Sequence, residues 1–265
     1  MNRLYIWALL CCFVVHGITA QEVAPKYYIL LTGASFASHH NGWFELGCSH
    51  LGASPINKAI GGESIVNTAN KMTEGLLYSF EELEEIDAMV IMHVHDRDVF
   101  DESQLLQDLN AYPKPFNRNN YAIAYDYVIK KYISDCYELR NNPQSRYYHT
   151  ATGKPASIVL CTNWHDGRVL FNTSIRKLAA KWGLPIVEFD THVGFSRHTV
   201  HPVTGEQQSL LYAQDTQMAD GIKHGWHPKR GKHEYIQQRM AAVFADVMRT
   251  ILPFKEQPLK ADQTL

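Results

Sequence analysis

The predicted fold starts from one stretch near the beginning of the chain, Tyr27-Tyr28-Ile29-Leu30-Leu31-Thr32-Gly33-Ala34-Ser35. Its apolar and aromatic residues predict a buried strand, and the small residues after them predict a sharp turn. Open parallel α/β sheets bind their ligands beyond the carboxyl ends of the strands. The turn at Gly33 and Ala34 allows the Ser35 side chain to stand clear of the strand. Ser35 is therefore either an exposed nucleophile or an ordinary helix N-cap, and its partners elsewhere in the chain decide between these roles.

Strand and helix patterns alternate along the rest of the chain. The continuous apolar run 88–92 is typical of a strand that is covered on both faces. The segment 190–219 has no clear period, and a long irregular loop of this kind is usually functional. Predicted strands cover 26–31, 55–60, 88–92, 157–161 and 185–189, and predicted helices cover 42–51, 64–72, 101–110, 121–139, 168–182 and 232–250. This alternation predicts a single-domain three-layer α/β/α sandwich with a five-stranded parallel sheet, as in flavodoxin-like folds.

Composition limits the classes of partner. The chain has 265 residues, 45% of them hydrophobic, which is enough for one substantial core. Its formal net charge is only -2 and its charges are mixed, so the sequence shows no footprint for nucleic acid or for an anionic membrane surface. We expect small or neutral partners. The 14 histidines keep both metal binding and general-base chemistry open.

Residues 1–20 are predicted to be a cleaved signal peptide, so that residues 21–265 form the folded domain of a secreted or periplasmic protein. Arg3 precedes the apolar stretch 4–15, and Ile18-Thr19-Ala20 resembles a cleavage site. We expect no stable membrane insertion after its removal. A lipoprotein signal at Cys11 or Cys12 ranks second, because Leu10 is a poor cleavage context. Three cysteines then remain, so at most one disulfide is expected among Cys48, Cys136 and Cys161.

Groups suited to acyl transfer follow the predicted strands. Ser35 follows the first predicted strand, Gly61-Gly62 follow the second and His95 follows the third. The segment 220–228 precedes the last predicted helix. Acyl transfer needs a hydroxyl, a neutral imidazole to take its proton, an acid to orient that imidazole, and N–H donors for the oxyanion. The sequence supplies all four kinds of group.

In these blocks the sequence resembles the GDSL/SGNH hydrolase superfamily. Thr32–Ser35 is similar to the first block of the family, which implies that Ser35 is the nucleophile. The segment 57–64 is similar to the second block and gives an oxyanion N–H to Gly62, beside that of Ser35 itself. His227-Pro228 resembles the fifth block, which makes His227 the general base. The resemblance implies a serine esterase that needs no metal and no cofactor.

Two blocks depart from the family pattern. The third normally supplies an Asn donor to the oxyanion, and His95 falls at or near that position. The fifth normally reads Asp, two residues, His, but His224 stands three residues before His227. Three arrangements stay open: Asp220 orients His227, Asp220 orients His224 as the base, or Asp215 is the acid. We favour Asp220 with His227.

The sequence therefore predicts a secreted Ser-His-Asp esterase, whose preferred substrate is a short acyl ester on a small molecule or glycan, most simply an acetylated polysaccharide. One rival is a metal-dependent hydrolase that uses His93 and His95 with ligands drawn from Asp96, Asp98, His192, His198 and Asp220. The other is a non-catalytic carbohydrate-binding protein on a decayed hydrolase fold. Sugar-stacking surfaces in either case are offered by Trp43, Trp164, Trp226, Tyr147 and Tyr148.

Overall fold

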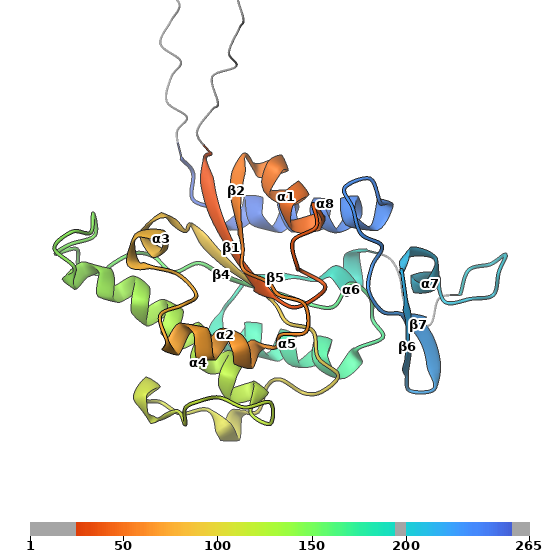
Figure 1. Ribbon diagram of the computed structural model, residues 1–265, viewed down its shortest axis with the longest axis horizontal. Helices are drawn as coiled ribbons and strands as arrows, with labels where there is room; N and C mark the ends of the chain where they lie inside the picture. The colour runs from red at the N-terminus through yellow and green to blue at the C-terminus, as the bar shows by residue number, and fades with distance from the viewer. Residues whose placement is uncertain (1–24, 194–199, 256–265) are drawn as a thin grey trace, which may run out of the picture.

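The computed structural model describes residues 25–193 and 200–255. Its centre is a five-stranded parallel sheet with the strand order β2-β1-β3-β4-β5 (Figure 1). β1 lies between β2 and β3, so the chain reverses its winding direction after β2, and open α/β sheets bind ligands at such a point. The strands are β1 (Tyr27–Gly33), β2 (Ala53–Asn57), β3 (Ala88–Met92), β4 (Ile158–Cys161) and β5 (Ile186–Val187). The predicted five-stranded parallel sheet is confirmed.

Helices cover both faces of the sheet and complete three layers. Figure 1 shows α1 and α8 together on one face, and α2, α4 and α5 on the other. The helices are α1 (Trp43–Leu51), α2 (Ile65–Thr73), α3 (Phe80–Glu85), α4 (Tyr121–Glu138), α5 (Val169–Trp182), α6 (Phe189–His192), α7 (Gln208–Tyr212) and α8 (Tyr235–Ile251). Every side chain of β3 is buried, as expected for a strand with helices on both sides.

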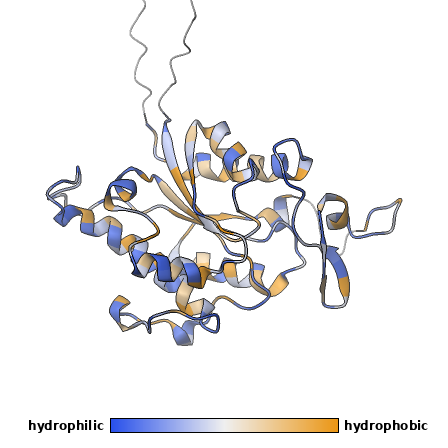
Figure 2. Ribbon diagram, viewed as in Figure 1, coloured by the Kyte–Doolittle hydropathy of each residue, from blue (hydrophilic) through white to orange (hydrophobic). Residues whose placement is uncertain are grey.

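The core follows the hydropathy of the sequence. Figure 2 shows hydrophobic residues along the strands of the sheet and on the helices beside them. Between the sheet and the α1–α8 layer, the ring of Trp43 meets those of Phe244 and Phe189 edge-on, with centroids 5.3 Å and 5.1 Å apart. Edge-to-face pairs of this kind are worth about 0.5–1.5 kcal/mol beyond the area that they bury. This packing fixes α8, and the loop before α8 carries His227.

The segment 101–110 is not the predicted α-helix. It contains two short 3₁₀ turns, η1 (Glu102–Gln104) and η2 (Leu109–Ala111). The carboxylates of Asp101 and Asp108 each accept a hydrogen bond from the backbone N–H two residues further on. Such local side-chain bonds compete with a helical backbone, which explains why the acidic residues do not begin a longer helix here.

The segment 190–219 contains more structure than the sequence indicated. Besides α6 and α7 it holds β6 (Thr216–Ala219), which pairs antiparallel with β7 (Ile222–Gly225) in a hairpin outside the main sheet (Figure 1). Asp220 and Gly221 form the turn, with φ of 50° and 76°. Positive φ at both central residues is the geometry of a type I′ turn, which matches the twist of a two-residue hairpin.

Three further predictions concern the signal peptide, the cysteines and membrane insertion. The predicted signal peptide and the lipoprotein cysteines lie outside the described residues. Cys48, Cys136 and Cys161 are buried and free, and burial raises the pKa of the Cys136 thiol to about 11. Among the described residues, no helix has the length and apolar character needed to cross a membrane.

Candidate active site

Ser35 lies in the turn directly after β1, at the carboxyl edge of the sheet. The turn requires the glycine at its start, because a Cβ on Gly33 would lie 2.7 Å from the Met92 carbonyl oxygen and 2.8 Å from Cβ of Ala37. The N–H of Ala34 donates to the same carbonyl, at 3.3 Å, which draws the turn against the end of β3. The backbone thus leaves the sheet abruptly, and the Ser35 hydroxyl points toward the loop before α8.

His227 joins Ser35 to a carboxylate. Its Nε2 lies 2.8 Å from the Ser35 hydroxyl oxygen, and its Nδ1 lies 2.7 Å from one oxygen of Asp215. The other oxygen of Asp215 accepts the backbone N–H of His227 at 2.7 Å, so the carboxylate holds both ring and backbone. Because a carboxylate can only accept, the ring proton belongs on Nδ1 and Nε2 is free to accept the serine proton. This is the geometry of an activated hydroxyl.

The β6–β7 hairpin brings the acid and the base together. Thr216 pairs with Gly225 at the open end of the hairpin, and Asp215 and Trp226 follow immediately outside this pair. The N–H of Trp226 donates to the carbonyl of Asp215 at 2.9 Å, which continues the ladder. Asp215 and His227 are twelve residues apart in the sequence, yet they face each other across the two strands.

This arrangement corrects the favoured acid. Asp220 sits in the turn at the other end of the hairpin, about 13 Å further along a four-residue strand. The carboxylate that contacts His227 is therefore that of Asp215, the third of the arrangements left open by the sequence. The expected spacing within one loop fails because the hairpin, and not a single turn, sets the distance between acid and base.

His224 is not the imidazole at Ser35. It lies in β7 and is 1% exposed, with its ring stacked on that of His165 at 5.6 Å between centroids. The Nε2 of His165 donates to the carbonyl of Gly225 at 2.8 Å, and its Nδ1 accepts the N–H of Gly167 at 2.9 Å. Burial lowers the pKa of His165 to about 3. A neutral imidazole therefore ties the hairpin to the loop after β4.

Sequence reasoning missed His165. It lies four residues beyond the end of β4, on the same carboxyl edge as Ser35. That position was a usable signal, since such loops line the ligand site of an open α/β sheet.

The loop after β2 lies beside Ser35 because the parallel ladder continues beyond the strand. Lys58 donates its N–H to Leu31 at 2.9 Å, and Ile60 donates to Gly33 at 3.1 Å. A Cβ on Gly61 would lie 4.0 Å from that of Ser35. Gly61 thus brings backbone, without any side chain, close to the serine, and Gly62 follows it in the chain.

The backbone N–H groups of Ser35 and Gly62 can act as hydrogen-bond donors to a ligand. Gly62 has φ of 82°, and its carbonyl accepts a 2.9 Å hydrogen bond from the Arg118 guanidinium. No acceptor for the N–H of Gly62 or of Ser35 is found within residues 25–193 and 200–255. Asn57 steadies both loops, because its amide donates to the Ala37 carbonyl at 2.9 Å and accepts the Ala59 N–H at 3.0 Å.

His95 stays neutral at physiological pH. Burial lowers its pKa to about 4, and the opposing attraction of Asp96 is smaller. Its ring lies on that of Tyr121, with centroids 4.1 Å apart. Its Nε2 is buried and has no hydrogen-bond partner in the described part of the chain. A neutral imidazole with an open nitrogen can donate one hydrogen bond.

The His93–His95 pair does not form the metal cluster of the rival prediction. His93 is fully buried, and its Nε2 lies 2.9 Å from the Thr68 hydroxyl and 3.3 Å from that of Thr32. Its ring is parallel to that of His95, with centroids 6.4 Å apart. In the described ranges no three His, Cys, Asp or Glu side chains gather as metal ligands, while His198 lies outside these ranges.

The proposed sugar-stacking residues are distributed over the molecule. Trp43 and Trp164 are buried in the core and offer no surface. Tyr147 packs against the core, and Tyr148 is 40% exposed. Trp226 is half-buried, with its ring centroid 5.4 Å from that of His227. Of the five, Trp226 is the residue that contacts the base.

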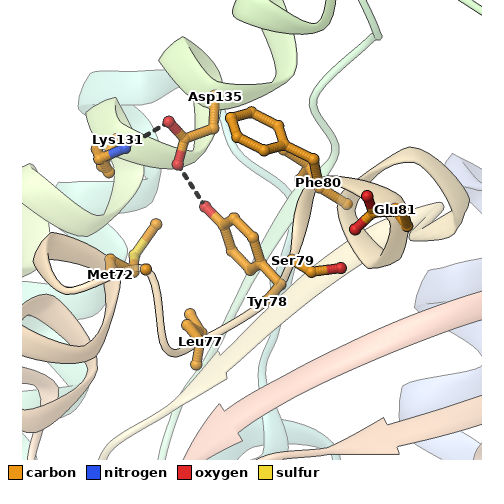
Figure 3. A pocket seen from close by; sticks show the side chains of 10 residues that line it. Met72, Leu77, Tyr78, Ser79, Phe80, Glu81, Lys131 and Asp135 are labelled. Carbon is orange, nitrogen blue, oxygen red and sulfur yellow. Dashed lines mark hydrogen bonds and ion pairs between the residues drawn. The ribbon is translucent and has the colours of Figure 1, made fainter. Parts of the chain in front are cut away.

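An apolar pocket of about 260 Å³ lies away from the serine, between α3 and the ends of α2 and α4. Figure 3 shows Tyr78 and Lys131 both reaching the carboxylate of Asp135 at its wall. The Tyr78 hydroxyl donates to Asp135 at 3.0 Å. Ser35 and His227 do not line this pocket.

Solved structures of other proteins are similar to this chain over most of its length. A possible lipase from Chitinophaga pinensis DSM 2588 superimposes with a TM-score of 0.51 at 13% identity, over 85% of this chain and 98% of that chain. A member of the lipolytic protein G-D-S-L family from Veillonella parvula DSM 2008 gives a TM-score of 0.41 at 11% identity, over 85% and 97%. LAE5, an alpha/beta hydrolase enzyme from the metagenome of Lake Arreo, gives 0.47 at 14%, over 85% and 96%. A comparison with curated proteins gives no match.

The chain is thus a three-layer α/β/α sandwich with a serine after the first strand and a histidine before the last helix, and its fold is similar to that of the possible lipase. The three-layer fold predicted from the sequence is thereby confirmed. The chain itself belongs to the family described as domain of unknown function (DUF5040), which matches residues 26–252.

Proposed function

We propose that this protein is a serine hydrolase of carboxylic esters. One observation carries the proposal: the Ser35 hydroxyl, the His227 imidazole and the Asp215 carboxylate form an unbroken chain, with contacts of 2.8 Å and 2.7 Å. A structural serine cap does not need an imidazole at its hydroxyl, and an imidazole in a core does not need a carboxylate on its far nitrogen. Together they form a proton-transfer path.

In the proposed reaction, Ser35 attacks the ester carbonyl while His227 takes its proton through Nε2. Asp215 orients the imidazole and stabilises the imidazolium. His227 then donates the proton to the departing alcohol, and a water molecule repeats the sequence to release the acid from Ser35. The serine proton leaves with the alcohol and is regained from the water molecule, so the enzyme ends the full cycle with the proton count at which it began.

The oxyanion that forms in this attack needs N–H donors. We assign this role to the backbone of Ser35 and Gly62 and to the side chain of His95, which replaces the amide usual in the class. The low pKa of His95, about 4, supports the assignment, since the ring stays neutral during turnover. One such donor typically contributes a factor of about 10²–10³ to kcat.

The preferred substrate is a short acyl ester of a carbohydrate outside the cell. Trp226 beside the base supports this choice, because an indole offers a stacking surface for a sugar ring. The predicted signal peptide at residues 1–20 supports an extracellular or periplasmic substrate.

An active-site probe tests the reaction class directly. A fluorophosphonate should label the purified protein stoichiometrically at Ser35, and the Ser35→Ala variant should remain unlabelled and inactive toward p-nitrophenyl acetate. His227→Ala should lose turnover, while His224→Ala serves as the matched histidine control for a role in the fold. Absence of labelling in the folded wild-type protein would overturn the proposal and favour a non-catalytic binding protein.

A further inference from the structure

The Trp226 ring lies between Arg168 and His227, the proposed base. It directly precedes α5, and its guanidinium carbon lies 4.4 Å from the centroid of the Trp226 ring. Trp226 adjoins His227 in sequence, and its ring meets that of Phe36 edge-on at 4.8 Å. A cation placed over an indole face is held in orientation as well as in position. Arg168 is thus a fixed positive charge beside the Ser35–His227 contact.

Arg168 and Gln217 present two donors without acceptors. One terminal nitrogen of Arg168 donates to the side-chain oxygen of Gln217, which fixes the amide so that its nitrogen is a separate donor. The Nε of Arg168 and the amide nitrogen of Gln217 are both buried, and neither has a hydrogen-bond partner in the described part of the chain. Buried donors left unpaired are costly, so a site with two of them suits a ligand that brings acceptors.

Three arginines place positive charge at this edge of the sheet. Arg97, Arg118 and Arg168 all act on His95 and lower its pKa, so their charges reach the catalytic edge of the sheet. The opposing carboxylate is Asp96, which attracts Arg168 and lies 3.7 Å from Arg97. Within the described residues, no carboxylate lies within ion-pairing distance of Arg168. A planar guanidinium with free donors favours a carboxylate or sulfate over a neutral hydroxyl.

The position of Arg168 indicates which part of the substrate it would contact. His227 must hand its proton to the departing alcohol, so the alcohol portion of the ester passes beside the imidazole. Trp226 and Arg168 extend the surface from that imidazole outward. We infer that the alcohol moiety of the substrate is an anionic sugar, whose carboxylate or sulfate is bound by Arg168 and Gln217. This inference rests on the proposed esterase function.

Three acetyl esters of one sugar test the inference: methyl galactoside acetate, its galacturonate counterpart and its 6-sulfate. We expect kcat/KM for one or both anionic esters to exceed the neutral value roughly tenfold or more, the worth of one or two charge-assisted hydrogen bonds. In Arg168→Gln that preference should fall toward one, and Arg168→Lys should keep only part of it. Arg249→Gln, on an exposed ion pair with Asp246 in α8, is the matched control and should keep the wild-type preference.

The outcomes separate this inference from the proposed function. Hydrolysis of p-nitrophenyl acetate with equal rates on the three sugar esters would overturn the anionic substrate and leave the esterase standing. Absence of all ester hydrolysis and of Ser35 labelling would remove both. If Arg168→Gln does not fold, Gln217→Leu takes its place, because it removes one of the two donors without touching the charge. An unchanged preference in that variant would assign the anion to another group and refute the site.

Discussion

Replacing Asp215 with Asn tests which carboxylate orients the base. In the wild type, Asp215 accepts from Nδ1 of His227 at 2.7 Å and from its backbone N–H at 2.7 Å. An Asn oxygen can keep the backbone contact, but its NH₂ group then faces Nδ1 and favours the ring tautomer with the proton on Nε2. That tautomer cannot take the proton of Ser35, and the charge that stabilises the imidazolium is also lost.

The size of the effect follows from these two losses. A hydrogen bond to a charged group is worth about 1.5–3 kcal/mol, and the wrong tautomer adds to that cost. Asp215 is 46% exposed, so water replaces part of the lost stabilisation. A total of about 3–4 kcal/mol in the barrier corresponds to a fall in kcat of about 10²–10³.

The matched control is Asp220→Asn, because Asn tolerates the positive φ of the hairpin turn. Initial rates with p-nitrophenyl acetate, together with thermal unfolding of each variant, make the comparison. We expect Asp220→Asn to stay within about threefold of the wild type, the range of a surface substitution. A greater loss in Asp220→Asn than in Asp215→Asn, with both proteins folded, would refute the assignment of the acid.

Three further outcomes are expected. His95→Ala should lower kcat by about 10²–10³ with an Asn variant recovering part of it, since an amide also donates; equal rates in all three proteins would exclude His95 from the oxyanion site. Gly33→Ala should cost about 1–3 kcal/mol of stability, measured by urea unfolding, because its Cβ meets the Met92 carbonyl at 2.7 Å. Burial lowers the pKa of His165 from 6.5 to about 3, so between these values the unfolded chain binds a proton that the folded chain does not. The unfolding free energy should therefore fall with decreasing pH by about 1.4 kcal/mol per unit from this group, and His165→Gln should flatten that slope between pH 6.5 and 4.5; an unchanged slope contradicts the reasoning.

The sheet was predictable because its signals are local. The run Ala88–Met92 is apolar at every position, and the strand has those bounds. Ser35 was found for the same reason, since a small-residue turn after a buried strand marks the carboxyl edge. The predicted helix over 101–110 was wrong because a carboxylate such as that of Asp101 suits a helix start and an isolated turn equally well.

The hairpin was missed because its strands are short and carry no apolar face. β6 alternates between exposed and half-buried residues, and β7 is held by contacts distant in sequence, such as the 2.9 Å bond from Gly225 N–H to the Ser209 hydroxyl. One signal was present, namely Asp220-Gly221, a dipeptide typical of type I′ turns. Pairing outward from that turn places Asp215 opposite Trp226, beside His227, and selects the acid.

Asp215 and His227 are therefore positioned by the same structural unit, the β6–β7 hairpin. Asp215 and His227 lie at the open end of the β6–β7 hairpin. If the hairpin moved away from the main sheet, both residues would move away from Ser35 together, and the hydrogen bond between them would stay intact. The 2.8 Å hydrogen bond from His165 to the Gly225 carbonyl is one of the contacts that hold the hairpin in this position. A substitution of His165 should therefore lower turnover while the Asp215–His227 pair stays assembled.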